Sequence, residues 1–516
     1  MALARTHTRA LLGVEAPRVE VEVHLAGGLP AFHLVGLPEA AVRESRTRVR
    51  SAIQNAGFNF PATRIAANLA PADLPKEGTR FDLAIAIAIL VASGQVPARQ
   101  VEGVELIAEL ALDGGLRPVP GAIAAGMALA GTSRTLLMAP QDAAQAARVK
   151  GLKVIAVRNL REVFEALAKP AEWLCASPAA LPSAPDDGPD LADISGQPVG
   201  RRVLEIAAAG GHNLLLTGPP GSGKTMLATR LPGILPPLDE DASLEVARVH
   251  GLRSGTAPAP SRAIPFRSPH HSATPAALIG GGQRPQPGEI SLAHRGVLFL
   301  DELAEFPRQT LDLLREPLEA GAITVARAGH CMVFPAEFQF VAAMNPCPCG
   351  GADDPELPCR CTPTTIARYR GRISGPLLDR IDCHLHVERA PTRQLIHALM
   401  PASGNTGGAR AGQGSPNETS AVVRRRVTAA RSLQLSRQGR LNARLKSRAL
   451  IEVTPLGGQT KDLMLKAAER LSLSRRGFDG VLRVARTIAD MERSQPIESH
   501  HVLEALQLRA RPQTSH

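Results

Sequence analysis

Aromatic residues are scarce in this chain of 516 residues: Phe, Trp and Tyr together make up 3% of it, with one Trp and one Tyr. No segment approaches the ~18 uninterrupted apolar residues of a membrane-spanning helix, and the N-terminus lacks a signal-peptide pattern. We therefore expect a cytoplasmic protein with no membrane contact. Hydrophobic residues still make up 44% of the chain, so we expect sizeable cores that are aliphatic rather than aromatic.

Cysteine is also sparse, and seven cysteines in such a chain do not indicate a disulfide framework. Acidic residues are few in the last quarter. From Arg389 to the C-terminus, 22 Lys/Arg stand against 9 Asp/Glu, a net charge of +13, whereas the whole chain carries +11 and residues 1–388 therefore −2. This asymmetry favours an anionic partner, most simply nucleic acid. A solvated basic surface in an arginine-rich chain is the alternative.

A complete G-x-x-x-x-G-K-[ST] loop is present in the middle of the chain. The apolar run 213–217 before it predicts a buried strand, and residues 226–231 after it predict a helix that Pro232 ends. In this context the loop N–H groups point at phosphate oxygens, and the helix N-terminus favours negative charge. The predicted nucleotide-binding residues are Gly218, Pro219, Pro220, Gly221, Ser222, Gly223, Lys224 and Thr225.

A second apolar strand, predicted over 297–300, ends in two acidic residues. We expect Lys224 to reach the β- and γ-phosphates of ATP, and Thr225 and Asp301 to hold Mg²⁺. Glu302 is placed to polarise the water that attacks the γ-phosphate. A third strand, 338–344, ends at Asn345, whose amide can orient that water or the γ-phosphate. ATP hydrolysis is therefore the predicted chemistry.

Two C-x-C pairs follow Asn345 at close spacing. Four thiolates around Zn²⁺ would form a closed structural site, which a loop without an apolar core needs. Four reduced thiols are the alternative, because C-x-C is tighter than the usual C-x₂-C spacing. The candidate zinc ligands are Cys347, Cys349, Cys359 and Cys361.

For other polar residues around the core, the sequence pattern indicates a function less specifically. Arg380 is the candidate for a finger that reaches a neighbour's γ-phosphate, with a salt bridge to Asp379 or Asp382 as the alternative. For the adjacent His270 and His271, contact with substrate or a neighbouring subunit is favoured over metal binding.

A helix is predicted over 309–318, followed by a β-hairpin. The hairpin's turn at 326–330 holds Arg327 and His330, which we expect to contact DNA. An arginine-rich helix is predicted over 421–445, with further helices at 461–471, 478–492 and 499–507. It adds Arg424, Arg425 and Arg426 as candidate DNA contacts, and Arg483 on a later helix is a candidate nucleotide sensor.

Residues 1–170 alternate strand-like and helix-like segments, including a strand at 19–25 and helices at 39–56 and 82–92. The stretch 68–82 resembles the catalytic region of Lon-type serine proteases, which place a nucleophilic Ser after a Pro-Lys-x-Gly turn. Arg80 stands at that position, and no Lys occurs between Lys76 and Lys150 to complete a Ser/Lys dyad. We therefore expect a Lon-like fold without proteolytic chemistry.

The whole chain resembles the YifB/ComM family of magnesium-chelatase-like AAA+ ATPases. The resemblance implies an α/β multidomain protein with an N-terminal Lon-protease-like α+β domain, an AAA+ P-loop core with a parallel sheet, and a C-terminal helical lid. We place these domains at 1–172, 193–388 and 389–516, with a Pro-rich linker at 173–192. Residues 401–416 are longer and more glycine-rich than the family leads us to expect. The stretches that carry the resemblance are 34–39, 68–78, 218–225, 266–271, 287–302, 344–349 and 368–382.

The resemblance also implies a homo-hexameric ring that hydrolyses ATP at subunit interfaces. ComM-type members are similar to branch-migration helicases that help integrate incoming DNA during natural transformation, so single-stranded or branched DNA is the expected partner. A magnesium-chelatase-type motor acting on a protein partner, an ATP-dependent Lon-like protease and an ATP-assembled adaptor are the alternatives. With one Trp and one Tyr, base stacking is not expected to dominate, and contacts to the DNA backbone should weaken strongly with salt.

Overall fold

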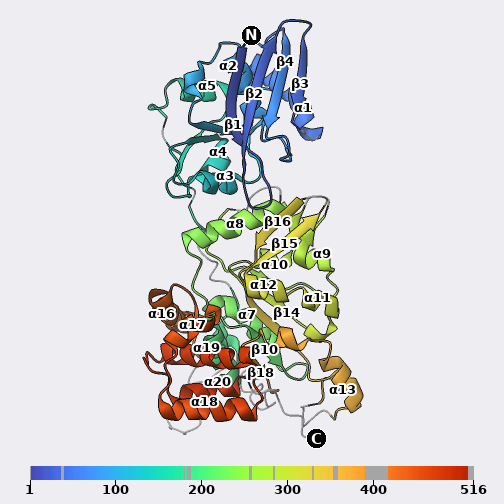
Figure 1. Cartoon of the computed structure of the whole chain (residues 1–516), viewed down its shortest axis with the longest axis vertical. Helices are drawn as coiled ribbons and strands as arrows, with labels where there is room; N and C mark the ends of the chain where they lie inside the picture. Colours follow the sequence, from blue (N-terminus) through green and yellow to red (C-terminus); the bar gives the residue numbers. More distant parts are fainter. Residues whose placement is uncertain are drawn as a thin grey trace, which may run out of the picture.

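The computed structural model is an elongated molecule in which the chain forms mixed α/β layers followed by helices (Figure 1). The N-terminal residues lie at one end, and the C-terminal helices lie at the other end beside the strand β10 (Leu214–Thr217). The residues it describes are 2–36, 40–173, 175–178, 180–182, 188–254, 259–282, 285–327, 330–352, 358–389 and 417–509.

Two main sheets build the N-terminal part. A four-stranded sheet has the order β1-β2-β4-β3, in which β3 and β4 pair in parallel, and a three-stranded parallel sheet has the order β5-β8-β9. The strands are β1 (Ala2–Arg9), β2 (Arg18–Ala26), β3 (Ala31–Val35), β4 (Arg64–Ala70), β5 (Val104–Ile107), β6 (Glu109–Leu110), β7 (Leu116–Arg117), β8 (Thr135–Met138) and β9 (Lys153–Ala156). The helices are α1 (Ala40–Asn55), α2 (Asp82–Ala92), η1 (Ala98–Gln100), α3 (Ala122–Leu129), α4 (Pro140–Ala146) and α5 (Leu160–Ala168).

The predicted strand at 19–25 is confirmed as β2, and its alternating pattern buries Val19, Val21 and Val23 on one face. The predicted helix at 82–92 is confirmed as α2, which is buried on nearly all sides and forms the centre of this core. Asp82 enters this apolar environment paired with Arg48, whose Nε donates to Asp82 Oδ2 at 2.7 Å. Burial nevertheless raises the pKa of Asp82 to about 6.

A five-stranded, all-parallel sheet forms the central part, in the order β11-β14-β17-β10-β18. Its strands and the short pairs beside it are β10, β11 (Phe266–Arg267), β12 (Gly280–Gly281), β13 (Gln286–Pro287), β14 (Val297–Leu300), β15 (Ala322–Arg327), β16 (His330–Pro335), β17 (Gln339–Met344) and β18 (Cys383–His386). The helices are η2 (Leu191–Asp193), α6 (Pro198–Gly210), α7 (Lys224–Ile234), α8 (Glu240–Ser254), α9 (Pro275–Ile279), α10 (Glu289–Leu292), η3 (Leu303–Glu305), α11 (Arg308–Asp312), α12 (Arg315–Ala320), α13 (Pro363–Arg370) and α14 (Gly375–Leu378).

Two helix ends in this part differ from the prediction. Pro232 was expected to end the helix after the phosphate-binding loop, but α7 continues to Ile234, because a proline in the last turn removes only its own N–H bond. The single helix predicted over 309–318 is instead two short helices, α11 and α12. The Leu314 N–H bonds to Leu311 O in a tighter turn, and Pro317 has no N–H to continue the ladder.

The predicted β-hairpin is confirmed as the antiparallel pair β15–β16, whose last described pair is Arg327 with His330. Its middle, around the Val325–Met332 pair, packs against the N-terminal part. Val14 is buried in the same apolar cluster as Val325 and Phe334, and a Cβ built on Gly13 would lie 3.5 Å from Met332 Sδ. Figure 1 shows β15, β16 and α8 next to the N-terminal part.

Helices make up the described C-terminal part, and they pack against α6 and α7 of the central part. They are α16 (Ser420–Gln438), η4 (Asn442–Arg444), α17 (Ser447–Val453), α18 (Gly458–Arg470), α19 (Arg475–Met491) and α20 (Ser499–Gln507). The helix predicted to run to residue 445 ends earlier, because Gly439 takes a left-handed conformation with φ +70° and closes it as a C-cap. The glycine-rich stretch 401–416 lies outside the described residues.

No helix in the described ranges is both long and apolar enough to cross a membrane.

Candidate nucleotide-binding and cysteine sites

The parallel sheet brings the predicted nucleotide-binding segments together. Thr217 at the end of β10 pairs with Met344 at the end of β17, and β17 lies between β10 and β14. Because parallel strands end at one edge of a sheet, the phosphate-binding loop, Asp301 and Asn345 all emerge there. The loop packs closely: a Cβ on Gly218 would lie 2.2 Å from Val387 O, so this position requires glycine.

Lys224 lies inside the loop and bonds to three oxygens around it. Its Nζ donates to Gly218 O at 2.7 Å, to Pro219 O at 2.8 Å and to Asn345 Oδ1 at 3.2 Å. Burial lowers the pKa of the Lys224 ammonium, and the nearby Asp301 carboxylate opposes that shift. The structure thus brings the predicted lysine and the predicted amide into direct contact.

Thr225 and Asp301 also meet, because the Thr225 hydroxyl donates to Asp301 Oδ2 at 2.7 Å. A hydroxyl and a carboxylate at this spacing are oxygen ligands of the kind that Mg²⁺ takes beside a nucleotide. Glu302 follows in a left-handed conformation with φ +51°, a strained geometry for a non-glycine residue that is typical of functional positions. Its side chain is 55% exposed, next to the loop.

His271 is a neighbour of Glu302 that the sequence did not reveal. Its Nδ1 lies 3.0 Å from Glu302 Oε2, and its ring packs edge-on against Phe306 and beside His270. The two residues are far apart along the chain, so only the folded structure shows this pairing. Among the described residues, His270 and His271 belong to no group of three possible metal ligands.

Arg380 lies at the opposite edge of the sheet from its own phosphate-binding loop, just before β18. Its Nη2 bonds to Glu319, and its Nη1 donates to Pro376 O at 2.8 Å. Arg380 thus forms an internal salt bridge, but the predicted partners, Asp379 and Asp382, are wrong, because the acid is Glu319.

The expected position of Arg483 at the nucleotide is also wrong in this structure. Its Nη2 donates to Asp382 Oδ1 at 3.0 Å, and Asp382 precedes Cys383, which pairs with Leu214 at the start of β10. The guanidinium is thus separated from the loop by the length of the strand. Burial opposes ionisation of Asp382, but Arg483 and then His212 outweigh it and lower the pKa to about 2.

The four predicted cysteines lie together in space, with all four sulfur atoms within 4.8 Å of one another. The Sγ–Sγ distances are 3.4 Å for Cys347–Cys349, 3.7 Å for Cys347–Cys359 and 3.7 Å for Cys349–Cys359. A zinc ion with Zn–S bonds of about 2.3 Å requires tetrahedral S–S edges of about 3.8 Å. The donor set therefore fits a four-coordinate Zn²⁺ and is too widely spaced for a disulfide.

Backbone N–H groups surround these sulfurs. The N–H groups of Gly351 and Arg360 donate to Cys349 and hold the pKa of its thiol at about 6. The Ala352 N–H donates to Cys347 in the same way, although burial raises the pKa of that thiol. Such bonds orient sulfur ligands around a metal.

Comparison with known proteins agrees with this geometry. The family model described as magnesium chelatase, subunit ChlI, matches residues 190–395, and related models match residues 21–142 and, as the ChlI C-terminal, 417–509. Uncharacterized protein YifB of Salmonella typhimurium is 46% identical over 518 residues, covering 99% of this chain and 97% of that protein. Competence protein ComM of Haemophilus influenzae is 45% identical over 515 residues, covering 99% and 98%.

The chain belongs to the YifB/ComM family of magnesium-chelatase-like proteins. The resemblance read from the sequence motifs is thereby confirmed, as are the mixed α/β architecture with parallel sheets and the helical C-terminus. A more distant relative is the magnesium-chelatase 67 kDa subunit of Heliobacterium mobile, 28% identical over 225 residues, which cover 38% of this chain and 30% of that subunit.

In this YifB/ComM chain, two of the three candidate DNA-contacting arginines on α16 bond within the protein. Arg424 Nε donates to Gly233 O at 2.8 Å, and Arg426 pairs with Glu205 and Glu418 at 2.6 and 2.7 Å. Arg425 is exposed and has no partner among the described residues. The side chains of Arg327 and His330 lie outside the described part, although their strands are confirmed.

The protease-like turn of the N-terminal part holds a buried arginine. Arg80 is 4% exposed, and its Nη2 bonds to Pro120 O. Burial lowers the pKa of its guanidinium to about 10, against the opposing effect of Asp142. Lys76 is also buried and bonds to Pro71 O. The position where a Lon-type protease has its nucleophilic Ser is therefore occupied by a buried arginine. That the fold of this part is Lon-like remains a prediction.

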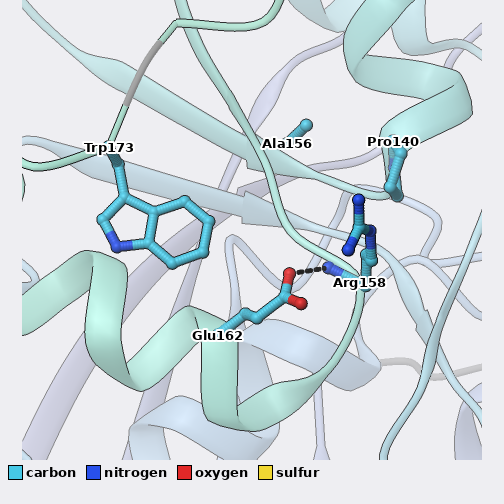
Figure 2. Close-up of a pocket in the computed structure, with 5 residues that line it drawn as sticks. All are labelled: Pro140, Ala156, Arg158, Glu162 and Trp173. Carbon is cyan, nitrogen blue, oxygen red and sulfur yellow. Dashed lines mark hydrogen bonds between the residues drawn. The ribbon is translucent and has the colours of Figure 1, made fainter.

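A cavity of about 220 Å³ lies in the N-terminal part, lined by residues of α4, β9 and α5 and by Arg158 and Trp173 (Figure 2). Figure 2 shows Trp173, the single Trp of the chain, across this cavity from Arg158 and Pro140. Glu162 Oε2 accepts a hydrogen bond from the Arg158 N–H at 2.7 Å, just before α5, and the N-cap of that helix is Asn159, which accepts from the Glu162 N–H.

Proposed function

We propose that this protein is an ATP-hydrolysing ring motor that acts on DNA as a branch-migration helicase. The observation that carries the proposal is the convergence of Lys224, Thr225, Asp301, Glu302 and Asn345 at one edge of the parallel sheet. This set contains a phosphate-binding lysine, two magnesium ligands, a carboxylate for water activation and an amide. Phosphoryl transfer needs these parts and little covalent chemistry.

Each residue's role follows from its position. Lys224 neutralises the β- and γ-phosphates of ATP, and Thr225 and Asp301 would hold a Mg²⁺ ion, which would supply further positive charge there. Glu302 accepts a hydrogen bond from the attacking water, while His271, 3.0 Å from Glu302, fixes the direction of the carboxylate. Asn345, in contact with Lys224 at 3.2 Å, positions the γ-phosphate or the water.

A ring assembly fits the location of Arg380. A side chain at the opposite sheet edge does not serve its own loop, but the next subunit's loop can lie against it. We therefore propose a homo-hexamer in which Arg380 acts at the interface, held by Glu319 until a nucleotide replaces that carboxylate.

DNA is the proposed substrate for three reasons. A relative with 45% identity over nearly its full length is named a competence protein, the last quarter of the chain carries +13, and the β15–β16 hairpin ends, in its described part, at Arg327 and His330. We propose single-stranded or branched DNA taken up by natural transformation, held through its phosphates. A chelatase-type motor is less favoured, since the 67 kDa chelatase subunit of Heliobacterium mobile aligns with 38% of this chain. A protease is less favoured because of the buried Arg80.

We further propose one structural Zn²⁺ per chain at the four cysteines, whose spacing fits tetrahedral thiolate coordination. Elemental analysis of protein purified without chelators should give about one Zn²⁺ per chain. A zinc content near zero would contradict this assignment.

The functional test is the rate of ATP hydrolysis with and without single-stranded and branched DNA, with Glu302→Gln as the hydrolysis-deficient control. We expect branched DNA to stimulate hydrolysis and a branch-migration assay to need both ATP and an intact Glu302. If the wild type has no DNA affinity even at low salt with ATP bound, the helicase proposal is wrong. Porphyrin metallation with chelatase partner subunits would then favour the chelatase-type motor.

A further inference from the structure

The cysteine cluster, defined as Cys347, Cys349, Cys359 and Cys361, packs directly against the phosphate-binding loop. The contact is between Gly350 and Pro220: a Cβ built on Gly350 would lie 2.4 Å from Pro220 Cδ and 2.6 Å from Cγ. Gly350 also has φ +82°, and its N–H bonds to Cys347 O at 3.0 Å. The turn 347–350, which contains the first two cysteines, therefore packs against the phosphate-binding loop at Pro220.

A second connection runs through the chain itself. Asn345, whose Oδ1 accepts from Lys224 Nζ at 3.2 Å, stands two residues before Cys347. Cys347 is fully buried, with 0% exposure. Any movement of its sulfur is therefore transmitted to the asparagine that contacts the phosphate-binding lysine.

The chain leaving the cluster returns to the same place. Helix α13 begins at Pro363, two residues after Cys361. On that helix, Arg370 Nε donates to Pro346 O at 3.0 Å. The described residues before and after the cluster are thus joined between Pro346 and Arg370 and again at the four sulfurs.

We infer that the cysteine cluster is a metal-dependent latch on the nucleotide site, so that Zn²⁺ occupancy sets the affinity for ATP. The inference rests on the proposed nucleotide and zinc sites, and it goes beyond a structural role for the metal. With Zn²⁺ bound, the turn at Gly350 is held against Pro220 and Asn345 is held at Lys224. Without it, no bond ties the four sulfurs to one another, so the turn at Gly350 is no longer held against the loop.

The first test removes the metal without touching the loop. In the Cys359→Ser/Cys361→Ser variant, both substitutions lie after residue 357, so Asn345, Gly350 and the phosphate-binding loop keep their sequence. We expect zinc content to fall from about one per chain to near zero and the affinity for a fluorescent ATP analogue to fall about tenfold, the scale on which outer-shell partners affect site affinity. Chelation of wild-type Zn²⁺ should weaken binding equally, and added Zn²⁺ should restore it.

The second test disturbs the contact without touching the metal. Gly350→Ala places a methyl group against the Pro220 ring while it keeps all four sulfurs. We expect unchanged zinc content and about tenfold weaker binding of the analogue, within the range for overpacking. Gly103→Ala is the matched control: it has a similar φ of +73°, but its Cβ would meet nothing within 4 Å.

The outcomes distinguish a failure of the latch from a failure of the proposed zinc site or of the proposed DNA motor. If both test variants bind the analogue as the wild type does, the latch is refuted, while the zinc site survives or fails by metal content alone. Wild-type protein without zinc also overturns the latch. None of these measurements includes DNA, so a failure here is distinct from a failure of the proposed DNA motor.

Discussion

Arg426 and Arg425 are neighbours on an arginine-rich helix, but the structure predicts different effects of replacing them: one on stability and the other on DNA binding. Arg426 Nε and Nη2 donate to the two oxygens of Glu205 at 2.6 and 3.1 Å, and its guanidinium also contacts Glu418. These bonds connect α16 to α6, the helix that leads to the phosphate-binding loop. Arg425 is exposed.

The size of the effect follows from the exposure of the partners. Removing one partner of a buried ion pair costs about 3–5 kcal/mol, because the other charge is left uncompensated. The Glu205 side chain is 9% exposed, whereas those of Arg426 and Glu418 are 43% and 53% exposed. Water screens the exposed half of this network, so Arg426→Ala should destabilise the α6–α16 contact by about 2 kcal/mol. Arg425→Ala should change stability by less than about 0.5 kcal/mol.

Two assays on each variant decide the matter. Hydrogen exchange of the α16 amides should be faster by about 30-fold in Arg426→Ala, the factor that corresponds to 2 kcal/mol, and unchanged in Arg425→Ala. Salt titration of DNA binding should give a slope smaller by about one unit in Arg425→Ala. Wild-type exchange rates in Arg426→Ala would refute the assignment of this arginine to the α6–α16 contact. A normal salt slope in Arg425→Ala would remove it from the proposed DNA surface.

Three further predictions concern the loop, the ring and acid stability. Lys224→Ala should lose nucleotide binding, and Glu302→Gln should bind ATP but hydrolyse it at least about 100-fold more slowly, as measured by analogue binding and phosphate release; fast hydrolysis by Glu302→Gln would disprove its role. Arg380→Ala should be inactive alone but regain activity when mixed with Glu302→Gln subunits, and full activity of Arg380→Ala alone would exclude a finger. His294, followed by Arg295, lowers the pKa of Glu245 to about 2 despite partial burial. The pKa of Glu245 in the folded state is thus below the unfolded value of about 4.3. The ionised Glu245 therefore stabilises the fold above pH ~4.3, and this contribution is lost as the pH falls towards ~2. Urea unfolding between pH ~4.3 and ~2 should show that the free energy of unfolding of Glu245→Gln falls by about 1–2 kcal/mol less than that of the wild type, after allowance for screening. An equal fall in both proteins would contradict the pKa shift.

Local patterns allowed the sequence to predict the elements of the nucleotide site. The phosphate-binding loop and the acid after β14 each follow an apolar strand directly, so their type and order are encoded within a few residues. Asn345 was predicted for the same reason. The prediction was wrong at the end of α16, where Gly439 forms a C-cap, and at the break between α11 and α12, where the Leu314 N–H turns to Leu311 O and Pro317 has no N–H.

Long-range pairings were beyond sequence reasoning. His271 and Glu302, or Arg426 and Glu205, come together only because separate elements pack side by side. A run of arginines without acids predicts a basic surface, yet the acid that neutralises Arg426 is supplied from α6. Arg483 was expected near ATP, but Asp382, on another element, binds it at the opposite sheet edge.

The contact between the β15–β16 hairpin and the N-terminal part limits how far the tip of the hairpin can move. Val14 of the N-terminal part shares a core with Val325, and Gly13 lies against Met332. Opening this seam would expose apolar side chains at about 1.5–3 kcal/mol each. Beyond the Val325–Met332 pair, the described hairpin has two more pairs, ending at Arg327–His330. At ~3.4 Å per residue, the described arm that can bend independently is only about 7 Å long, so a longer stroke has to carry the N-terminal part with it.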